Sequence, residues 1–278
     1  MQEISGPFGR AIHIETLPTR VIAEMYRAKC GFDVVPHLSD LKSIDLFECV
    51  QTGYRFWRPE SIAGNESFYR GLSAAWPEYY RDWRWEYGPM LSMLTMSDRL
   101  LEVGSGRGYF LKLTEGRVKA ATGLELNFEA IQNKVTSNSI HATTIEEHAR
   151  AHPRAYEIAC SFQVLEHVTN PASFIESCIA AVRPGGLIAF STPNLKHRAF
   201  SRRQDAFDLP PHHVGYFTPD VYRRLAKTYG LKLESITEES RWDTTGAGLK
   251  ATARRWLVRV RQSLLGPGAC VLAVFRRS

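Results

Sequence analysis

The chain has 278 residues, of which 44% are hydrophobic and 23% are charged, and its formal net charge is +6. This composition is typical of a soluble globular protein with room for one α/β domain and an extension, or for two small domains. No apolar run approaches the ~18 residues of a membrane span, and the first ten residues lack the apolar segment of a signal peptide. The five scattered cysteines form no disulfide framework, so we expect a reducing, cytoplasmic location.

Two stretches in the first 96 residues are predicted to be short β-hairpins. Residues 25–36 and 46–57 each have one cysteine near the expected turn, and a glycine follows it. Tetrahedral zinc needs four ligands, and neither stretch has a second thiolate at the spacing of a zinc site. We therefore expect a small apolar β subdomain here, and no metal in the protein.

Aromatic residues are concentrated between Phe68 and Tyr87. Phe68, Leu72 and Trp76 recur at every fourth position, and Tyr80 continues the series after Pro77. This spacing predicts a helix whose rings pack mostly against the core.

A glycine-rich turn follows at residues 100–110, Leu-Leu-Glu-Val-Gly-Ser-Gly-Arg-Gly-Tyr-Phe. The apolar start predicts a buried parallel strand, and the aromatic end opens a helix. Glycines 104, 106 and 108 let the chain turn tightly and let a ligand approach the bare backbone. The sequence therefore predicts a nucleotide-type binding site.

Two acidic residues limit the class of ligand that this turn can bind. Glu102 would repel a pyrophosphate, but it suits a ligand with ammonium and sulfonium charges. About 20 residues later, the predicted strand from Ala120 ends at Glu125, which is placed to accept hydrogen bonds from ribose hydroxyls. The stretch 102–108 and Glu125 together resemble the first motif and the ribose-binding acid of the class I S-adenosylmethionine-dependent methyltransferases.

The resemblance implies an α/β fold in which residues 97–278 form a doubly wound, mostly parallel seven-stranded sheet with a reversed last strand. Residues 1–96 would form the β-hairpin subdomain and a helical lid, in which Tyr80 and Trp85 cover the cofactor. The implied cofactor is S-adenosyl-L-methionine. Its binding residues would be Glu102, Gly104, Ser105, Gly106 and Gly108 at the amino-acid end, Glu125 and Leu126 at the ribose, and Thr144 and Ile145 at the adenine.

A later buried strand, residues 156–162, is followed by Gln163-Val-Leu-Glu-His167, which is similar to the family's motif after that strand. Gln163 falls at the carboxyl end of the strand, where open parallel sheets bind ligands. We expect it to line the methionine side of the cofactor. His167 is either a general base near the methyl acceptor or a histidine that fixes the start of a helix.

Residues 187–191 are predicted to form the fifth strand of the sheet. Residues 195–216 are predicted to contribute to the acceptor site, because they leave this strand on the cofactor side. Their cations, Lys196, His197, Arg198, Arg202 and Arg203, suit a phosphate-bearing acceptor, although a solvated basic loop explains them equally well. His212 and His213 are adjacent, so in an extended segment they would point in opposite directions. At most one of them is then expected to be the base.

Between residues 249 and 265, apolar residues recur at helical spacing, and many of the other positions are basic. A helix here would pack on the domain, or it would associate with a membrane surface or an anionic partner.

The sequence thus predicts transfer of a methyl group to an oxygen or nitrogen of a small acceptor, such as a sugar, a nucleotide-linked sugar or another metabolite. Two alternatives stay open at this point. One is RNA methylation, which the net charge suggests and the lack of a recognisable RNA-binding module disfavours, so no nucleic-acid partner is expected. The other is a non-catalytic cofactor-binding regulatory protein.

Overall fold

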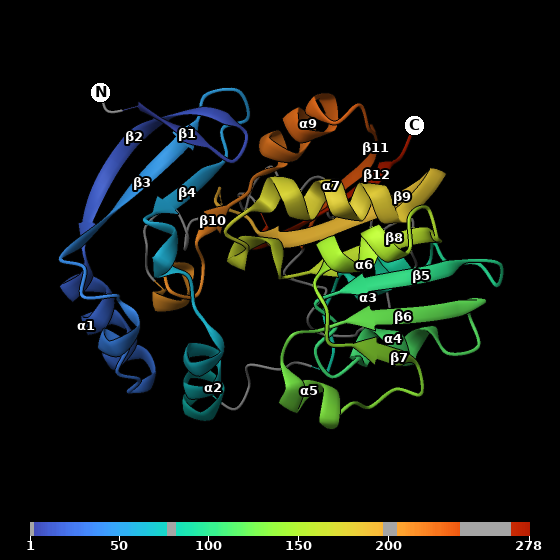
Figure 1. The fold of residues 1–278 in the computed structure, drawn as a ribbon, viewed down its shortest axis with the longest axis horizontal. Helices are drawn as coiled ribbons and strands as arrows, with labels where there is room; N and C mark the ends of the chain where they lie inside the picture. Colours follow the sequence, from blue (N-terminus) through green and yellow to red (C-terminus); the bar gives the residue numbers. More distant parts are fainter. Residues whose placement is uncertain (1–2, 77–81, 197–204, 240–267) are drawn as a thin grey trace.

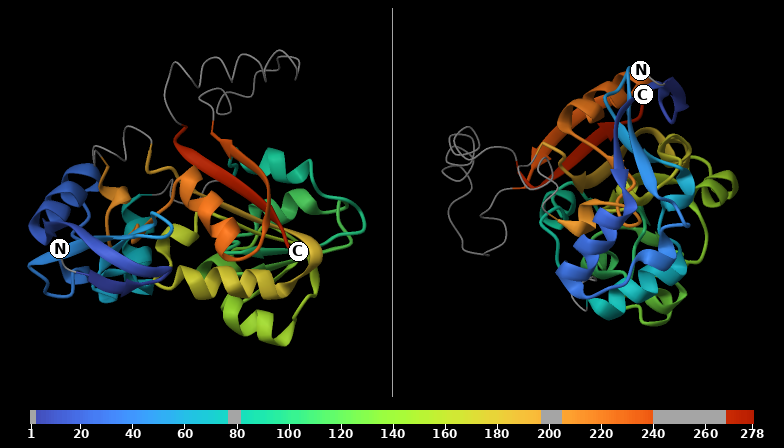
Figure 2. Two further views of the ribbon diagram at one scale, coloured as in Figure 1. Left: turned by 90° about the horizontal axis from the view of Figure 1, so that it is seen from above. Right: turned by 90° about the vertical axis from the view of Figure 1, so that its left-hand side faces the viewer.

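The chain folds into two β-sheets that lie side by side (Figure 1). The computed structural model describes residues 3–76, 82–196, 205–239 and 268–278. A five-stranded sheet contains the N-terminal strands, and a seven-stranded sheet contains the glycine turn. Figure 2 shows the two sheets from above and from the N-terminal side.

The five-stranded sheet is antiparallel throughout, with the order β1-β2-β3-β4-β10. Its strands are β1 (Glu3–Gly6), β2 (Gly9–Pro18), β3 (Ser43–Cys49), β4 (Arg55–Arg58) and β10 (Gly215–Tyr216). The hairpin predicted for residues 46–57 is confirmed by β3 and β4. Because β10 comes from the second half of the chain, this sheet joins segments that lie about 160 residues apart in sequence.

The hairpin predicted for residues 25–36 is wrong. Residues Thr19–Cys30 form helix α1, and the 3₁₀ helix η1 (Val35–His37) follows. Ile22, Ala23 and Tyr26 are buried at helical spacing, a pattern that starts before residue 25. Gly31 has a φ of 69° and ends the helix as its C-cap, so this glycine is a helix stop and not a hairpin turn.

The aromatic region forms helix α2 (Glu66–Ala75) after the short helix η2 (Glu60–Ile62). Phe68 and Leu72 are fully buried, as their spacing of four residues predicted. The Asn65 side chain caps the helix by accepting a hydrogen bond from the Phe68 amide. Tyr80 lies outside the described residues. A further helix, α3 (Tyr87–Leu91), leads to the seven-stranded sheet.

The seven-stranded sheet confirms the predicted fold class. Its strands are β5 (Arg99–Val103), β6 (Ala120–Leu124), β7 (Ser139–His141), β8 (Tyr156–Phe162), β9 (Val182–Pro193), β11 (Lys232–Glu238) and β12 (Cys270–Arg276). They are arranged in the order β11-β12-β9-β8-β5-β6-β7. Only the last strand, β12, runs antiparallel to its neighbours among the described strands.

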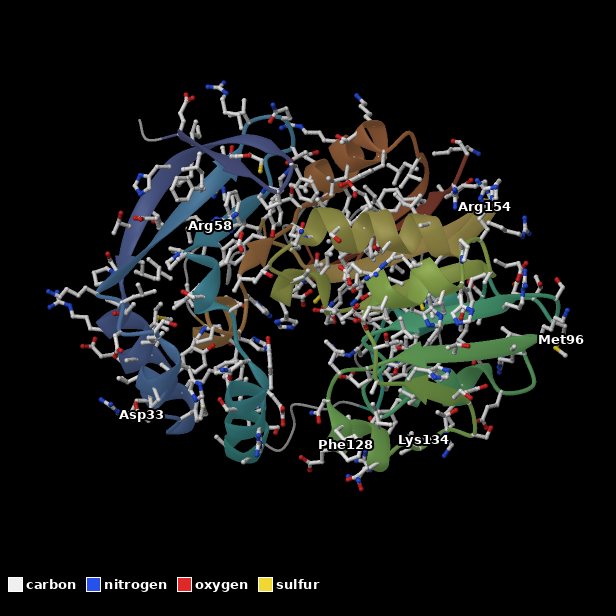
Figure 3. The ribbon with its side chains drawn as sticks, in the orientation of Figure 1. Asp33, Arg58, Met96, Phe128, Lys134 and Arg154 are labelled. Carbon is white, nitrogen blue, oxygen red and sulfur yellow. The ribbon has the colours of Figure 1, made fainter. Side chains whose placement is uncertain are left out.

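Helices connect the strands in the alternating pattern that parallel pairing requires. They are α4 (Tyr109–Thr114), α5 (Phe128–Gln132), α6 (Ile145–Ala151), α7 (Pro171–Ala181) and α9 (Pro219–Thr228), with the 3₁₀ helices η4 (Leu165–His167) and η5 (Ala206–Asp208). Asn170 and Thr218 are N-caps of α7 and α9. Phe128 of the short helix α5 points outward, with 65% of its surface exposed (Figure 3).

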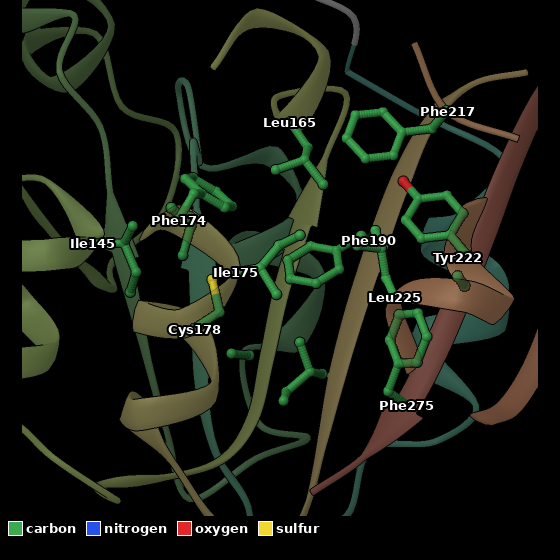
Figure 4. Packing of buried hydrophobic residues seen from close by; sticks show 14 of the residues in the cluster. Ile145, Leu165, Phe174, Ile175, Cys178, Phe190, Phe217, Tyr222, Leu225 and Phe275 are labelled. Carbon is green, nitrogen blue, oxygen red and sulfur yellow. The ribbon is translucent and has the colours of Figure 1, made fainter. Parts of the chain in front are cut away.

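Two apolar clusters cover the two faces of the seven-stranded sheet. Successive strand residues alternate between them, so Leu101 packs with α6, α7 and α9, whereas Leu100 packs with α3 and α4. Figure 4 shows the first cluster, in which Phe190 of β9 lies next to Ile175 of α7. This cluster also reaches the five-stranded sheet, because Tyr54 contacts Phe217 with 4.9 Å between ring centroids. One apolar cluster therefore spans both sheets.

None of the described helices combines the length and the apolar character needed to cross a membrane. The predicted helix at 249–265 lies outside the described residues.

An ion-pair network at the start of the sheet generates a prediction about pH. The carboxylate of Glu157 accepts two hydrogen bonds from the Arg99 guanidinium at 3.0 Å and one from Arg183 at 3.1 Å. The Arg99 side chain is the largest cause that lowers the Glu157 pKa to about 2. Because the folded pKa lies below the unfolded one, this stabilisation is present above about pH 4.5 and is lost as the pH falls toward 2.

We expect Glu157→Gln to lower the free energy of unfolding by about 2 kcal/mol at pH 7. Urea unfolding at pH 7 and at pH 3 measures the effect, and the difference from the native chain should be smaller at pH 3. Glu129→Gln is the control, because Glu129 is exposed on α5. An equal loss of stability at both pH values would contradict the assignment.

Candidate active site

The glycine turn lies between the carboxyl ends of β5 and β6. The amides of Gly104 and Ser105 both donate to the Leu124 carbonyl, at 2.8 and 3.0 Å. Gly104 and Gly108 have φ angles of 75° and 79°, in the left-handed region that favours glycine. A Cβ at Gly104 would lie 2.4 Å from Val164 Cγ2, and one at Gly108 would lie 2.6 Å from Thr136 Cγ2. Both glycines are therefore required by conformation and by space.

Glu102 is a buried acid at the end of β5, next to this turn. Only 3% of its surface is exposed, and its Oε2 has no hydrogen-bond partner among the described residues. Burial raises the pKa of Glu102 well above its usual value, and the nearby Glu125 raises it further, whereas Arg84 opposes them. A cationic ligand group beside Glu102 would favour its ionised form and fill its unused hydrogen-bonding capacity. Ser105 Oγ is also buried without a hydrogen bond to the described residues.

Glu125 connects the glycine turn to the loop after β6. Its Oε2 accepts from the Gly106 amide at 2.7 Å, and its Oε1 accepts from the amides of Leu126 and Asn127 at 2.9 and 2.8 Å. Each carboxylate oxygen has two lone pairs, so capacity for ligand hydroxyls is left at this carboxylate. Glu125 thus holds the turn in shape at the place where the sequence predicted a ribose-binding acid.

Gln163 lies at the carboxyl end of β8 and is part of a buried polar network. Its φ of 56° is unusual for a residue other than glycine. Its Nε2 donates to Ser191 Oγ at 2.8 Å and to Glu86 Oε1 at 3.2 Å, and Ser191 Oγ donates to the same Glu86 oxygen at 2.9 Å. The network therefore anchors the N-terminal end of α3 to β8 and β9.

Glu86 was missed by the sequence analysis. It is 1% exposed, although it stands between Trp85 and Tyr87 in a region that was interpreted only through its rings. The sequence did contain a signal, which is a single acid within an aromatic run. A carboxylate that is buried among such rings needs polar partners, so it indicates a buried polar network. Trp85 is half-buried next to it, and its indole Nε1 has no hydrogen-bond partner among the described residues.

The remaining cofactor candidates lie along the same edge of the sheet. Leu126 follows Glu125 and is 67% exposed, so its apolar side chain is available to a ligand. Thr144 caps α6 by accepting from the Glu147 amide at 3.2 Å. Ile145 is 2% exposed and packs into the core, so only its backbone could contact a ligand.

The three candidate histidines come together in one buried cluster. His167 of η4 lies 4.5 Å from His212 and 5.0 Å from His213 between ring centroids. Burial is the largest cause that lowers the pKa of each, for His167 to about 4, so the rings are neutral near pH 7. The expectation that His212 and His213 point in opposite directions is wrong, because their rings stack at 4.4 Å. Both amides bond to the Leu209 carbonyl, which makes this segment a tight turn and not an extended strand.

A family model matches the part of the chain that contains the glycine turn. Residues 73–236 match the model described as a methyltransferase domain, which is more than half of the chain. The chain belongs to this family. It is a class I S-adenosylmethionine-dependent methyltransferase, and its cofactor is S-adenosylmethionine.

Individual relatives agree with this assignment over shorter segments. The ubiquinone biosynthesis O-methyltransferase of Sodalis glossinidius is 36% identical over 109 residues, which are 36% of this chain and 43% of that protein. The enzyme of the same name from Pectobacterium carotovorum is 33% identical over 110 residues, or 37% of this chain and 46% of the relative. The chain therefore matches less than half the length of these curated relatives.

A solved structure shows the same fold. The SAM-dependent methyltransferase from Archaeoglobus fulgidus superposes with a TM-score of 0.53 and covers 69% of this chain and 91% of its own. Its sequence identity is 16%, so the likeness concerns the fold.

The residues at this edge fit S-adenosylmethionine. The partner-less oxygen of Glu102 suits the ammonium of the cofactor's amino-acid end, and the bare glycine turn admits a close ligand. Glu125 retains acceptor capacity, and Leu126 offers an exposed apolar surface.

We expect Gly104→Ala to abolish measurable binding of S-adenosylmethionine. The added methyl group would collide with Val164, and alanine would be strained in the left-handed backbone conformation of this position. Isothermal titration calorimetry measures the binding, and thermal denaturation checks the fold. Gly116→Ala is the matched control, since Gly116 has a φ of 71° but nothing within 4 Å of its Cβ position. Equal affinities in the two variants would show that the turn does not contact the cofactor.

Proposed function

We propose that this methyltransferase transfers the methyl group of S-adenosylmethionine to a hydroxyl oxygen of a small-molecule acceptor. The buried carboxylate of Glu102 beside the glycine turn, whose Oε2 has no hydrogen-bond partner among the described residues, is the observation that carries the donor side of the proposal. The choice of oxygen is supported by the relatives, which are named O-methyltransferases of ubiquinone biosynthesis.

On the donor side, each residue has a separate task. Glu102 and the turn from Gly104 to Gly108 would hold the amino-acid end, Glu125 would accept from the ribose hydroxyls, and Gln163 would line the methionine side. When bound, S-adenosylmethionine supplies an electrophilic methyl group on a sulfonium. The protein then contributes mainly alignment and exclusion of water.

Helix α3 and the residues before it would form part of the cover over this site. Glu86 holds the N-terminal end of α3 against Gln163 and Ser191, and Trp85 lies beside it. A fixed indole can exclude water and attract a sulfonium through its ring face. The same role for Tyr80 stays a prediction.

On the acceptor side, the chain has elements that the family model does not cover. Residues before 73, which supply α1 and four strands of the first sheet, lie outside the match, as does β12. The curated relatives match over an even shorter segment. We infer that the acceptor is selected by parts specific to this chain, so an acceptor other than a ubiquinone precursor is compatible with the relatives' names.

The phosphate-bearing acceptor predicted from the basic residues after β9 stays a prediction. Lys196 pairs with Asp220 of α9, and the cations at 197, 198, 202 and 203 lie outside the described residues. The general-base role of His167, His212 or His213 also stays a prediction.

We expect Glu125→Ala to weaken the binding of S-adenosylmethionine at least tenfold, because it removes a charged acceptor for the ribose and three hydrogen bonds that shape the turn. Calorimetry measures the affinity. The control is Glu129→Ala, which removes an exposed acid on the neighbouring helix α5. Unchanged affinity in Glu125→Ala would remove the ribose assignment.

The acceptor class is tested with methyl-labelled S-adenosylmethionine and three separate pools: ubiquinone precursors, nucleotide-linked sugars and total RNA. We expect label in one of the small-molecule pools, attached through oxygen as shown by mass spectrometry of the product. Gly104→Ala serves as the inactive control. Label in RNA, or on nitrogen, would contradict the proposal. Tight cofactor binding without incorporation into any pool would favour a non-catalytic regulatory protein.

A further inference from the structure

The histidine cluster has the composition of a metal site. The rings come from two segments, η4 after β8 and the turn after η5, which lie 45 residues apart in sequence. One candidate ligand atom from each of His167, His212 and His213 lies within 4.8 Å of the other two. Within the ranges that the structure describes, this is the one group of three histidine, cysteine or acidic side chains with such geometry.

The protonation of two of the rings follows from their backbone contacts. His167 Nδ1 lies 2.6 Å from the His212 carbonyl, and His212 Nδ1 lies 2.9 Å from the Phe207 carbonyl. A carbonyl oxygen only accepts, so Nδ1 carries the proton in both rings and Nε2 carries the lone pair. A neutral imidazole whose other nitrogen donates to a carbonyl or carboxylate is the usual form of a metal-binding histidine. His213 Nδ1 lies 3.8 Å from Asp208 Oδ1, which is too far for a hydrogen bond, so its contacts do not assign its protonated nitrogen.

Glu166 provides an independent observation. Its side chain is 2% exposed, and neither carboxylate oxygen has a hydrogen-bond partner among the described residues. Its Oε1 lies 3.9 Å from His167 Nε2, so the carboxylate faces the cluster. A buried carboxylate without hydrogen bonds is costly unless it is paired or coordinates a metal.

We propose that His167, His212, His213 and Glu166 bind one divalent transition-metal ion of the zinc type, contrary to the expectation of no metal from the sequence. A neutral imidazole has one lone-pair nitrogen, so a histidine that coordinates the ion cannot also be the general base. Three imidazoles and one carboxylate supply four ligands, which is the number that tetrahedral zinc takes. Ligand atoms around tetrahedral zinc are about 3.4 Å apart, so any of the three histidine atoms that are now as much as 4.8 Å apart must move closer on binding. Magnesium and calcium are disfavoured, because they prefer oxygen ligands.

The ion would join two parts of the molecule near the carboxyl ends of the parallel strands, the edge of the sheet where we propose that the cofactor binds (the cofactor edge). Glu166 and His167 follow Gln163 directly after β8, whereas His212 and His213 precede β10 of the other sheet. The Val214 amide already donates to the Glu166 carbonyl at 2.9 Å. A bound ion would therefore reinforce an existing contact and would not require a rearrangement of the fold.

The test uses the full chain without a polyhistidine tag. The protein is treated with a chelator, equilibrated with Zn²⁺ or Co²⁺ and desalted, and its metal content is measured by mass spectrometry. We expect about one ion per chain, a visible absorption spectrum of four-coordinate Co²⁺ and a higher melting temperature with Zn²⁺. None of these measurements depends on methyl transfer.

The variants Glu166→Gln and His167→Asn should bind Zn²⁺ at least tenfold more weakly. The matched control is His152→Ala, which removes an exposed histidine whose ring lies 4.5 Å from His148, away from the proposed site. It should bind like the native chain. Retention of no ion by the native chain, absence of the Co²⁺ spectrum, or native-like Zn²⁺ affinity in folded Glu166→Gln and His167→Asn would overturn the proposal.

Discussion

One carboxylate, that of Glu125, determines the shape of the cofactor edge. It accepts from Gly106 in the turn after β5 and from Leu126 and Asn127 after β6. Parallel pairing brings the carboxyl ends of β5 and β6 together, and the carboxylate then holds their two loops in one arrangement. Charge-assisted bonds to backbone amides are strong, so the site is organised before a ligand binds.

The second half of the site depends on the contact between the two sheets. The segment from η5 to β10 leaves the larger sheet and becomes an edge strand of the smaller one. Trp57 donates from its indole to the Tyr216 hydroxyl at 2.8 Å, and Tyr54 packs on Phe217. These contacts hold the turn that carries His212 and His213 against η4. The proposed acceptor side would therefore depend on the N-terminal sheet as well as on the methyltransferase fold.

The agreement and the errors of the sequence predictions have local physical causes. The strands that became β5, β6 and β8 were predicted well, because buried parallel strands are short apolar runs separated by glycine or helix caps. Helix α1 was missed because its buried positions begin at Ile22, before the stretch interpreted as a hairpin, and because Gly31 resembles a turn residue. The stacked histidines were missed because Leu209 accepts from both of their amides and folds the segment back.

What the sequence by itself determined is the glycine turn and its two acids, where we propose that the donor binds. The acid at 102, the three glycines and Glu125 are close together in the chain, and a strand and a helix are enough to place them. Only the tertiary structure decided which residues surround this edge. Glu86 reaches Gln163 across 77 positions, and His167 reaches His212 across 45. Such contacts arise from the packing of separate elements, and neither periodicity nor spacing encodes that packing locally.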